Sequence, residues 1–178
     1  IKITPDILPE PDAVLVHGIA PQQTLVDGLT EAEFAAYFHT HIATENTIFV
    51  GFNNIRFDDE FIRHLCYRNF FDPYEWHWQD GKSRWDLLDV VRMMRALRPD
   101  GLVWPETPDG KTTVRLELLT KANGVSHQNA HDALGDVDAL IAITGRVAKA
   151  QPKLFEYLLD MRDKKKIAQL VMEDKPFV

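Results

Sequence analysis

Two short segments combine side chains that could hold a cation or accept a proton. In the first, residues 51–60 (GFNNIRFDDE), a polar loop follows an apolar run and leads to Asp58 at the predicted start of a helix. Carboxylates at a helix N-terminus are stabilised by free backbone N–H groups and by the helix dipole. Asp58 is therefore either a structural cap or a cation ligand, and this segment alone leaves both interpretations open.

The second segment, residues 130–136 (AHDALGD), contains His131 and Asp136. Residues five positions apart lie about 140° apart around a helix. The two side chains therefore share a site only if His131 lies in the loop before the helix and leans over its first turn. Histidine side chains titrate near neutral pH and are suited to accept a proton. The alternative is a structural His–Asp hydrogen bond.

A third segment, His17-Gly18-Ile19, follows a short apolar run, and a glycine turn needs no functional explanation by itself. In this order and at these separations, however, the three segments together resemble the DnaQ-like 3′→5′ exonucleases that carry the DEDDh motif set. The His-Gly-Ile turn resembles the V-H-G-I segment of that family. Asn54-x-x-Phe57-Asp58 resembles its second motif, and His131-x-x-x-x-Asp136 resembles its third.

Longer tracts narrow the resemblance. Residues 83–90 (SRWDLLDV), which include Asp86 where the family often has a helix-starting aspartate, and residues 118–124 (LLTKANG) resemble the bacterial exodeoxyribonuclease I group. This closer resemblance extends from about residue 9 to residue 165. It implies a ribonuclease-H-like α/β domain that removes nucleotides from the 3′ end of single-stranded DNA.

The resemblance also implies a cofactor and roles for individual residues. Two divalent cations, normally Mg²⁺ with Mn²⁺ able to substitute, would be held by four carboxylates, of which Asp58 and Asp136 match two. His131 matches the catalytic general base. His17 and Asn54 match positions beside the terminal nucleotide. The expected macromolecular partner is single-stranded-DNA-binding protein, and we expect a monomer.

The sequence departs from the family at its first motif, an Asp-x-Glu pair on the opening strand. Asp58-Asp59-Glu60 contains this string but already belongs to the second motif, and residues 1–12 offer Asp6 and Glu10 without a strand to carry them. We therefore expect the chain to lack the N-terminal part of its domain, and the parent protein to be the enzyme. The alternatives are a catalytically inactive module that binds single strands or a replication partner, and an exoribonuclease of the same superfamily.

Apolar patterning predicts the elements that position these residues. Thr47–Val50 is predicted to be a buried strand, and the Thr30-x-x-Glu33 capping box predicts a helix that ends before residue 44. The helix after Asp58 is expected to bury Phe61, Ile62, Leu65 and Cys66. Further helices are expected after Asp86 up to Pro99, from 114–119, over 131–149 and from Pro152, whereas residues 1–12 are expected to be extended.

These elements indicate an α/β class with a mixed central sheet flanked by helices and lacking its first strands. We expect an exonuclease domain over residues 1–165, incomplete at its N-terminus. Residues 166–178 are expected to form a linker toward a following domain.

Composition limits the remaining classes. The 178 residues are 45% apolar and 26% charged, which is typical of a globular domain and excludes collagen and low-complexity disorder. No apolar run is long enough to suggest a membrane span, and the single cysteine, Cys66, indicates a reducing compartment, so we expect a cytoplasmic protein. The net charge of −7 is unusual for a DNA-binding protein. Bound cations and local basic side chains would have to offset it, and the candidates for DNA contacts are Arg56, Arg84, Arg115 and Lys121.

Overall fold

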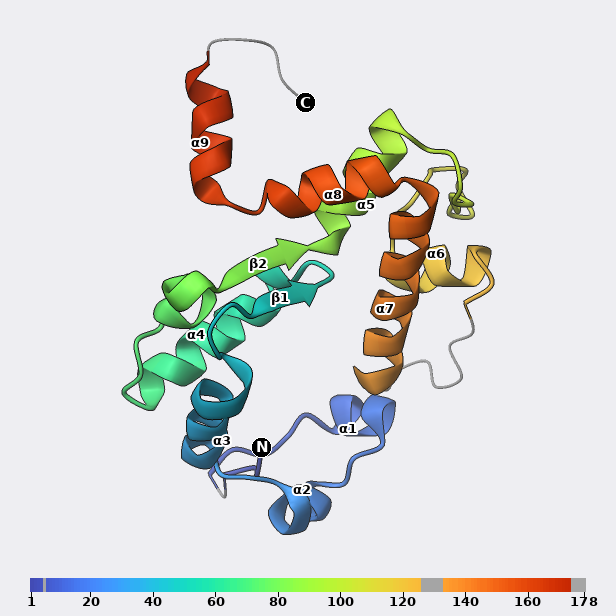
Figure 1. Ribbon diagram of the computed structural model, residues 1–178. Helices are drawn as coiled ribbons and strands as arrows, with labels where there is room; N and C mark the ends of the chain where they lie inside the picture. Colours follow the sequence, from blue (N-terminus) through green and yellow to red (C-terminus); the bar gives the residue numbers. More distant parts are fainter. Residues whose placement is uncertain (5, 126–132, 174–178) are drawn as a thin grey trace.

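The computed structural model describes residues 1–4, 6–125 and 133–173, in which helices surround a short parallel sheet (Figure 1). Strand β1 (Ile48–Gly51) pairs with strand β2 (Ser83–Asp86), with Gly51 opposite Asp86. Helix α4 (Asp58–Arg68) lies in the connection between them. Because the strands are parallel, their carboxyl ends meet at one end of the sheet, which is where α/β proteins bind ligands.

Further helices precede, connect and follow these elements along the chain. They are α1 (Pro11–His17), α2 (Pro21–Asp27), α3 (Glu31–Tyr37), α5 (Leu87–Leu97), α6 (Leu116–Ala122), α7 (Ala133–Ala150), α8 (Pro152–Asp160) and α9 (Lys164–Met172). Short turns of other helix types are η1 (π, Phe38–Ile42), η2 (3₁₀, Asn54–Arg56), η3 (3₁₀, Glu75–His77) and η4 (3₁₀, Gln79–Gly81). No described helix is long and apolar enough to cross a lipid bilayer.

Local capping explains where two helices begin. The Thr30 hydroxyl accepts a hydrogen bond from the Glu33 N–H at 3.2 Å, and the Glu33 carboxylate accepts one from the Thr30 N–H at 2.8 Å. This is the predicted capping box of α3. Asp86 caps α5 by accepting a hydrogen bond from the Leu88 N–H at 3.0 Å, and α5 ends at Leu97, before Pro99. Both predicted helix starts are confirmed.

Two clusters of buried apolar side chains hold the elements together. The larger joins β2 to α5, α6 and α7 through Trp85, Leu87, Val91, Met94, Leu119, Ile143 and Val147, among others. The smaller joins η1, α4 and η3 through Phe38, Ala43, Cys66 and Trp76, with Phe49 of β1 packed against it. Each strand therefore contributes an aromatic side chain to a different cluster, which fixes the sheet between them.

Burial of β1 and α4 differs from the sequence-based prediction. Ile48 and Val50 of β1 are 36% and 42% exposed, so the strand is not buried. Val50 stays exposed because it lines a cavity and no described helix covers it there. In α4, Leu65 and Cys66 are buried as predicted, but Phe61 is 62% exposed. Phe61 lies in the first turn of α4, away from the smaller core, and its ring packs edge-on against Phe57.

Three other elements also differ from the prediction. The expected extended segment over residues 1–12 ends early, because Pro11 begins α1 with its fixed φ at the first helical position. Strand β2 is not evident from the sequence. Helix α9 covers most of the stretch predicted to be a linker, and Asp163 caps it by accepting a hydrogen bond from the Lys165 N–H. Whether a domain boundary follows residue 165 stays a prediction.

Candidate active site

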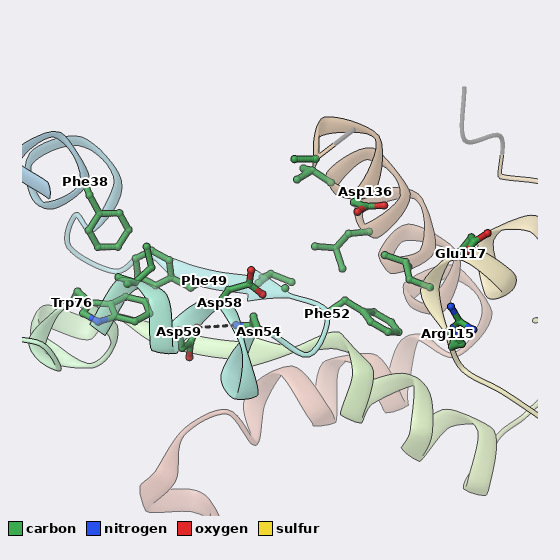
Figure 2. Close-up of a pocket in the computed structure, with 17 residues that line it drawn as sticks. Phe38, Phe49, Phe52, Asn54, Asp58, Asp59, Trp76, Arg115, Glu117 and Asp136 are labelled. Carbon is green, nitrogen blue, oxygen red and sulfur yellow. Dashed lines mark hydrogen bonds between the residues drawn. The ribbon is translucent and has the colours of Figure 1, made fainter. Parts of the chain in front are cut away.

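A cavity of about 770 Å³ opens at the carboxyl end of β1 (Figure 2). Its walls come from β1, the loop after it, the first turn of α4, and the facing sides of α6 and α7. The polar side chains on its lining are Asn54, Asp58, Asp59, Arg115, Glu117 and Asp136. Two of the three segments that the sequence singled out, residues 51–60 and the described part of 130–136, therefore contribute to one cavity.

Asp58 and Asp136, the two predicted metal ligands, both line this cavity although they lie in different helices. Asp58 is the first residue of α4, and Asp136 lies in the first turn of α7. Both side chains are exposed, so their charged forms remain hydrated in the absence of a cation. Their oxygen atoms are the type of ligand that Mg²⁺ prefers.

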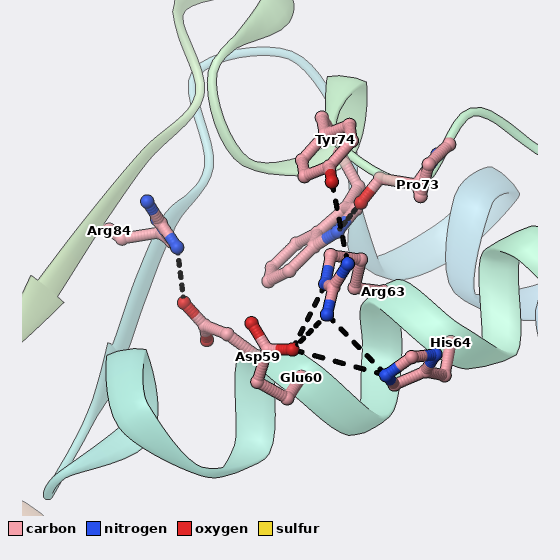
Figure 3. A network of polar contacts seen from close by, with 8 residues as sticks. Asp59, Glu60, Arg63, His64, Pro73, Tyr74 and Arg84 are labelled. Carbon is pink, nitrogen blue, oxygen red and sulfur yellow. Dashed lines mark hydrogen bonds and ion pairs between the residues drawn. The ribbon is translucent and has the colours of Figure 1, made fainter.

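The three consecutive acids at the start of α4 have different environments, and Figure 3 shows those of Asp59 and Glu60. Asp58 faces the cavity. Asp59 accepts a hydrogen bond from the Arg84 guanidinium at 2.7 Å, and Glu60 forms an ion pair with Arg63. The Arg63 hydrogen bonds hold the pKa of Glu60 below its ordinary value. Asp59 also lines the cavity but is paired with Arg84. Asp58 lines the cavity and forms no ion pair with a cationic side chain among the described residues.

Asn54 is held tightly beside Asp58. Its side chain is 6% exposed, and its Nδ2 donates to Asp59 Oδ1 at 3.4 Å. It packs against the backbone of Gly51 so closely that a Cβ on Gly51 would lie 2.4 Å from the Asn54 Cβ. Asn54 Oδ1 is buried and has no hydrogen-bond donor among the described residues. Asn54 therefore lines the cavity while its own side-chain oxygen is unpaired and enclosed beside Gly51.

The other predicted DNA contacts differ in position. Arg115 is exposed and lines the cavity. Arg84 forms an ion pair with Asp59, and its side chain is 21% exposed. It is therefore better placed to hold Asp59 than to contact DNA. Arg56 is exposed and lies 3.4 Å from Asp89, and Lys121 is exposed in the last turn of α6; neither is part of the cavity lining.

Of the two predicted histidines, His17 is the one that lies within the described residues. His17 ends α1, is exposed, and its Nδ1 accepts a hydrogen bond from the Ile19 N–H at 3.0 Å. It is not part of the cavity lining. His131 lies outside the described residues.

Sequence reasoning missed two cavity-lining acids, Asp59 and Glu117. Asp59 directly follows Asp58 in the sequence. Its role differs from that of Asp58 because it pairs with Arg84 of β2. Glu117 lies two positions after Arg115, which the sequence did single out. No sequence pattern predicted that α6 would face α4 across the cavity, because that depends on how distant helices pack.

The cavity partly fits a divalent cation. Within the described residues, no group of three or more His, Cys, Asp or Glu side chains is arranged to hold a metal ion. Two of the expected carboxylates, Asp58 and Asp136, nevertheless line one space, and the oxygen chemistry of this pair suits a hard cation.

Burial and positive charge also affect a histidine near Arg84. Burial, with a smaller effect of the Arg84 charge, lowers the pKa of His77 to about 4. His77 is therefore neutral at physiological pH. It adds no positive charge beside the Asp59–Arg84 pair.

Comparison with known proteins identifies close relatives. The exonuclease family model, RNase_T, matches residues 1–144. Exodeoxyribonuclease I of Escherichia coli K12 is 52% identical over an alignment that covers 99% of this chain and 38% of the relative. The chain therefore spans less than two fifths of the length of that relative.

Solved structures agree with these matches. The E. coli exonuclease I structure in complex with a dA16 oligonucleotide superposes with a TM-score of 0.89 at 53% identity, covering 95% of this chain and 36% of that one. An ExoI/SSB-Ct complex superposes with a TM-score of 0.85 at 52% identity, covering 93% and 35%. These superpositions confirm the α/β ribonuclease-H-like fold expected from the sequence, although the described sheet is a parallel pair and not a mixed sheet.

Proposed function

Because this chain belongs to the exonuclease family, as its motifs predicted, we propose that its protein removes mononucleotides from the 3′ end of single-stranded DNA. The observation that carries this proposal is the placement of Asp58 and Asp136. They come from helices separated by more than sixty positions and line one cavity at the carboxyl end of a parallel sheet. The identity of 52% to an exodeoxyribonuclease I supports DNA as the class of substrate.

Exonucleases of this family generally depend on divalent metal ions. We propose Mg²⁺ for this protein, with Mn²⁺ as a substitute, held in part by Asp58 and Asp136. Cations held there would supply positive charge for the attacking and leaving oxygens of an in-line displacement. In this proposal His131 accepts the proton of the attacking water, which a neutral imidazole can do.

The cavity wall supplies groups that suit a DNA strand. Arg115 can attract a phosphate, and we propose that Asn54, on the same cavity lining, lies beside the terminal nucleotide. Arg56 and Lys121 lie outside the cavity and would contact phosphates farther along the strand. His17 remains a candidate for the same end of the substrate.

The partner and compartment follow from the relatives and the composition. A relative has been solved as an ExoI/SSB-Ct complex, and we propose that single-stranded-DNA-binding protein is also a partner of the protein containing this chain. We further propose that it acts in the cytoplasm, where its buried Cys66 would stay reduced.

The test uses the complete gene product that contains these 178 residues and a single-stranded DNA labelled at its 5′ end. With Mg²⁺ present, progressive shortening from the 3′ end is expected, and blocking the 3′ terminus should stop it. An RNA strand of the same sequence should not compete. Preferred cleavage of the RNA would indicate the exoribonuclease alternative, and binding of DNA without cleavage would indicate the inactive binding module.

A further inference from the structure

Asp86 lies at the centre of the hydrogen bonds that hold the loop after β1. It is the last residue of β2, opposite Gly51 in the sheet, and is 5% exposed. Its Oδ1 accepts hydrogen bonds from the Asn53 N–H at 2.7 Å and the Leu88 N–H at 3.0 Å. Its Oδ2 lies 3.4 Å from the Ile55 N–H.

Helix capping accounts for only one of these three contacts. The bond from Leu88 caps α5, whereas the bonds from Asn53 and Ile55 come from the loop between β1 and α4. A carboxylate that accepts hydrogen bonds from backbone N–H groups forms stronger bonds than a neutral acceptor does. Because Asp86 is almost fully buried, losing these bonds would leave both the carboxylate and the loop amides poorly satisfied.

The tethered loop is the one that presents the site. Asn53 has a left-handed backbone, with φ of 67° and ψ of 19°, a conformation that few residues other than glycine adopt. The 3₁₀ turn η2 follows at once and contains Asn54, and α4 then begins at Asp58. A shift of this loop would move both cavity residues together, since only a few positions separate them.

We propose that Asp86 is a positioning residue that sets the place of Asp58 and Asn54 in the cavity by binding the loop amides of residues 53 and 55. Asp86 is not part of the cavity lining, so it acts through the backbone and not on the substrate. The link between this positioning and catalysis rests on the function proposed above, whereas the tether itself is a property of the fold. Misplacing a reacting group by about 1 Å can cost about a hundredfold in rate.

The informative variant is Asp86→Ser in the complete gene product. Serine is a good N-cap and keeps an acceptor for the Leu88 N–H, but it lacks the carboxylate that also binds the loop. Asp163→Ser is the matched control, because Asp163 caps α9 through the Lys165 N–H and is not among the described residues that line the cavity. Asp86→Asn serves as the conservative variant, since it keeps Oδ1 for Asn53 and Leu88.

The first measurement is hydrogen exchange resolved to single amides, which does not depend on activity. In Asp86→Ser we expect the Asn53 amide to exchange at least about tenfold faster while the Leu88 amide stays protected. The Asp163→Ser control should leave Asn53 unchanged. Unchanged protection of Asn53 in Asp86→Ser would overturn the proposal, because it would show that the loop does not depend on this carboxylate.

The second measurement is Mg²⁺-dependent release of nucleotides from single-stranded DNA. We expect kcat to fall about tenfold to a hundredfold in Asp86→Ser, as is typical when a residue that orients catalytic groups is removed. KM should change less than about threefold, and Asp86→Asn should recover most of the rate. Faster exchange with an unchanged kcat would overturn the positioning role. An inactive wild-type protein would refute the proposed function. The exchange result would still show whether the Asp86 carboxylate holds the loop amides.

Discussion

The ion pair between Asp59 and Arg84 permits a quantitative prediction about stability. Arg84 Nη1 lies 2.7 Å from Asp59 Oδ2, and the two side chains are 21% and 8% exposed. At an effective dielectric constant near 20, two charges about 4 Å apart attract by about 4 kcal/mol. Desolvation of the two charges offsets part of this attraction. The net contribution of the pair to the free energy of unfolding is therefore smaller than the loss caused by removing either side chain alone.

Removing Arg84 should cost more than removing Asp59. In Arg84→Met the Asp59 carboxylate stays buried without its cation, which we expect to lower the free energy of unfolding by about 2–3 kcal/mol. In Asp59→Asn the guanidinium can still reach water, because Arg84 is the more exposed partner, and we expect a loss of about 1–2 kcal/mol. The double variant Asp59→Asn/Arg84→Met should lose less than the sum of the two single variants.

Urea unfolding of the complete gene product measures these differences. The matched control is Lys111→Met, because Lys111 and Asp109 lie 2.8 Å apart but are 81% and 57% exposed. That pair has nearly the same length without the burial, so its loss should cost much less than the loss of the Asp59–Arg84 pair. If Arg84→Met and Lys111→Met were equally destabilising, burial would not determine the value of the Asp59–Arg84 pair and the reasoning would be refuted.

Three further predictions concern Cys66, His77 and Gly51. Burial raises the pKa of the fully buried Cys66 thiol to about 11. A thiol reagent at pH 8 should therefore label Cys66 at least about a hundredfold more slowly than free cysteine until urea unfolds the chain. Rapid labelling without urea would contradict this. Because burial lowers the pKa of His77 from 6.5 to about 4, its stabilisation is complete above about pH 6.5 and is lost as the pH falls toward 4. His77→Gln should therefore remove about 1–2 kcal/mol of the pH dependence of unfolding, after allowance for partial exposure, and an unchanged pH profile would exclude this origin. Gly51→Ala should displace Asn54 and reduce turnover, whereas Gly145→Ala, with no atom within 4 Å of its new Cβ, should leave turnover unchanged; equal turnover in the two variants would refute the close-packing argument.

Local signals allowed much of the fold to be predicted. The capping box at Thr30 and the N-cap at Asp86 depend on residues only a few positions apart, and both helices begin where predicted. Strand β2 could not be predicted, because Ser83 and Arg84 are not typical strand residues and the strand is defined by its pairing with β1. Phe61 was misassigned since helical spacing gives the face of a side chain but not how far the core extends along the helix.

The candidate site was predictable for a different reason. Asp58 and Asp136 were identified by resemblance to a family, and their common place in the cavity agrees with that interpretation. The sequence could not show that Arg84 pairs with Asp59, or that Asp86 binds the loop before Asp58. Both contacts join residues at least 25 positions apart, so they depend on the pairing of the strands.

The central claim is that Asp58 and Asp136 act together on a divalent cation to hydrolyse single-stranded DNA from its 3′ end. The most direct test is the rate of nucleotide release by Asp136→Asn in the complete gene product as Mg²⁺ is titrated, with DNA affinity measured separately without the metal. We expect the rate at saturating DNA to fall more than about a hundredfold, with DNA affinity changed less than about threefold. Wild-type turnover by Asp136→Asn over the same Mg²⁺ range would contradict the account.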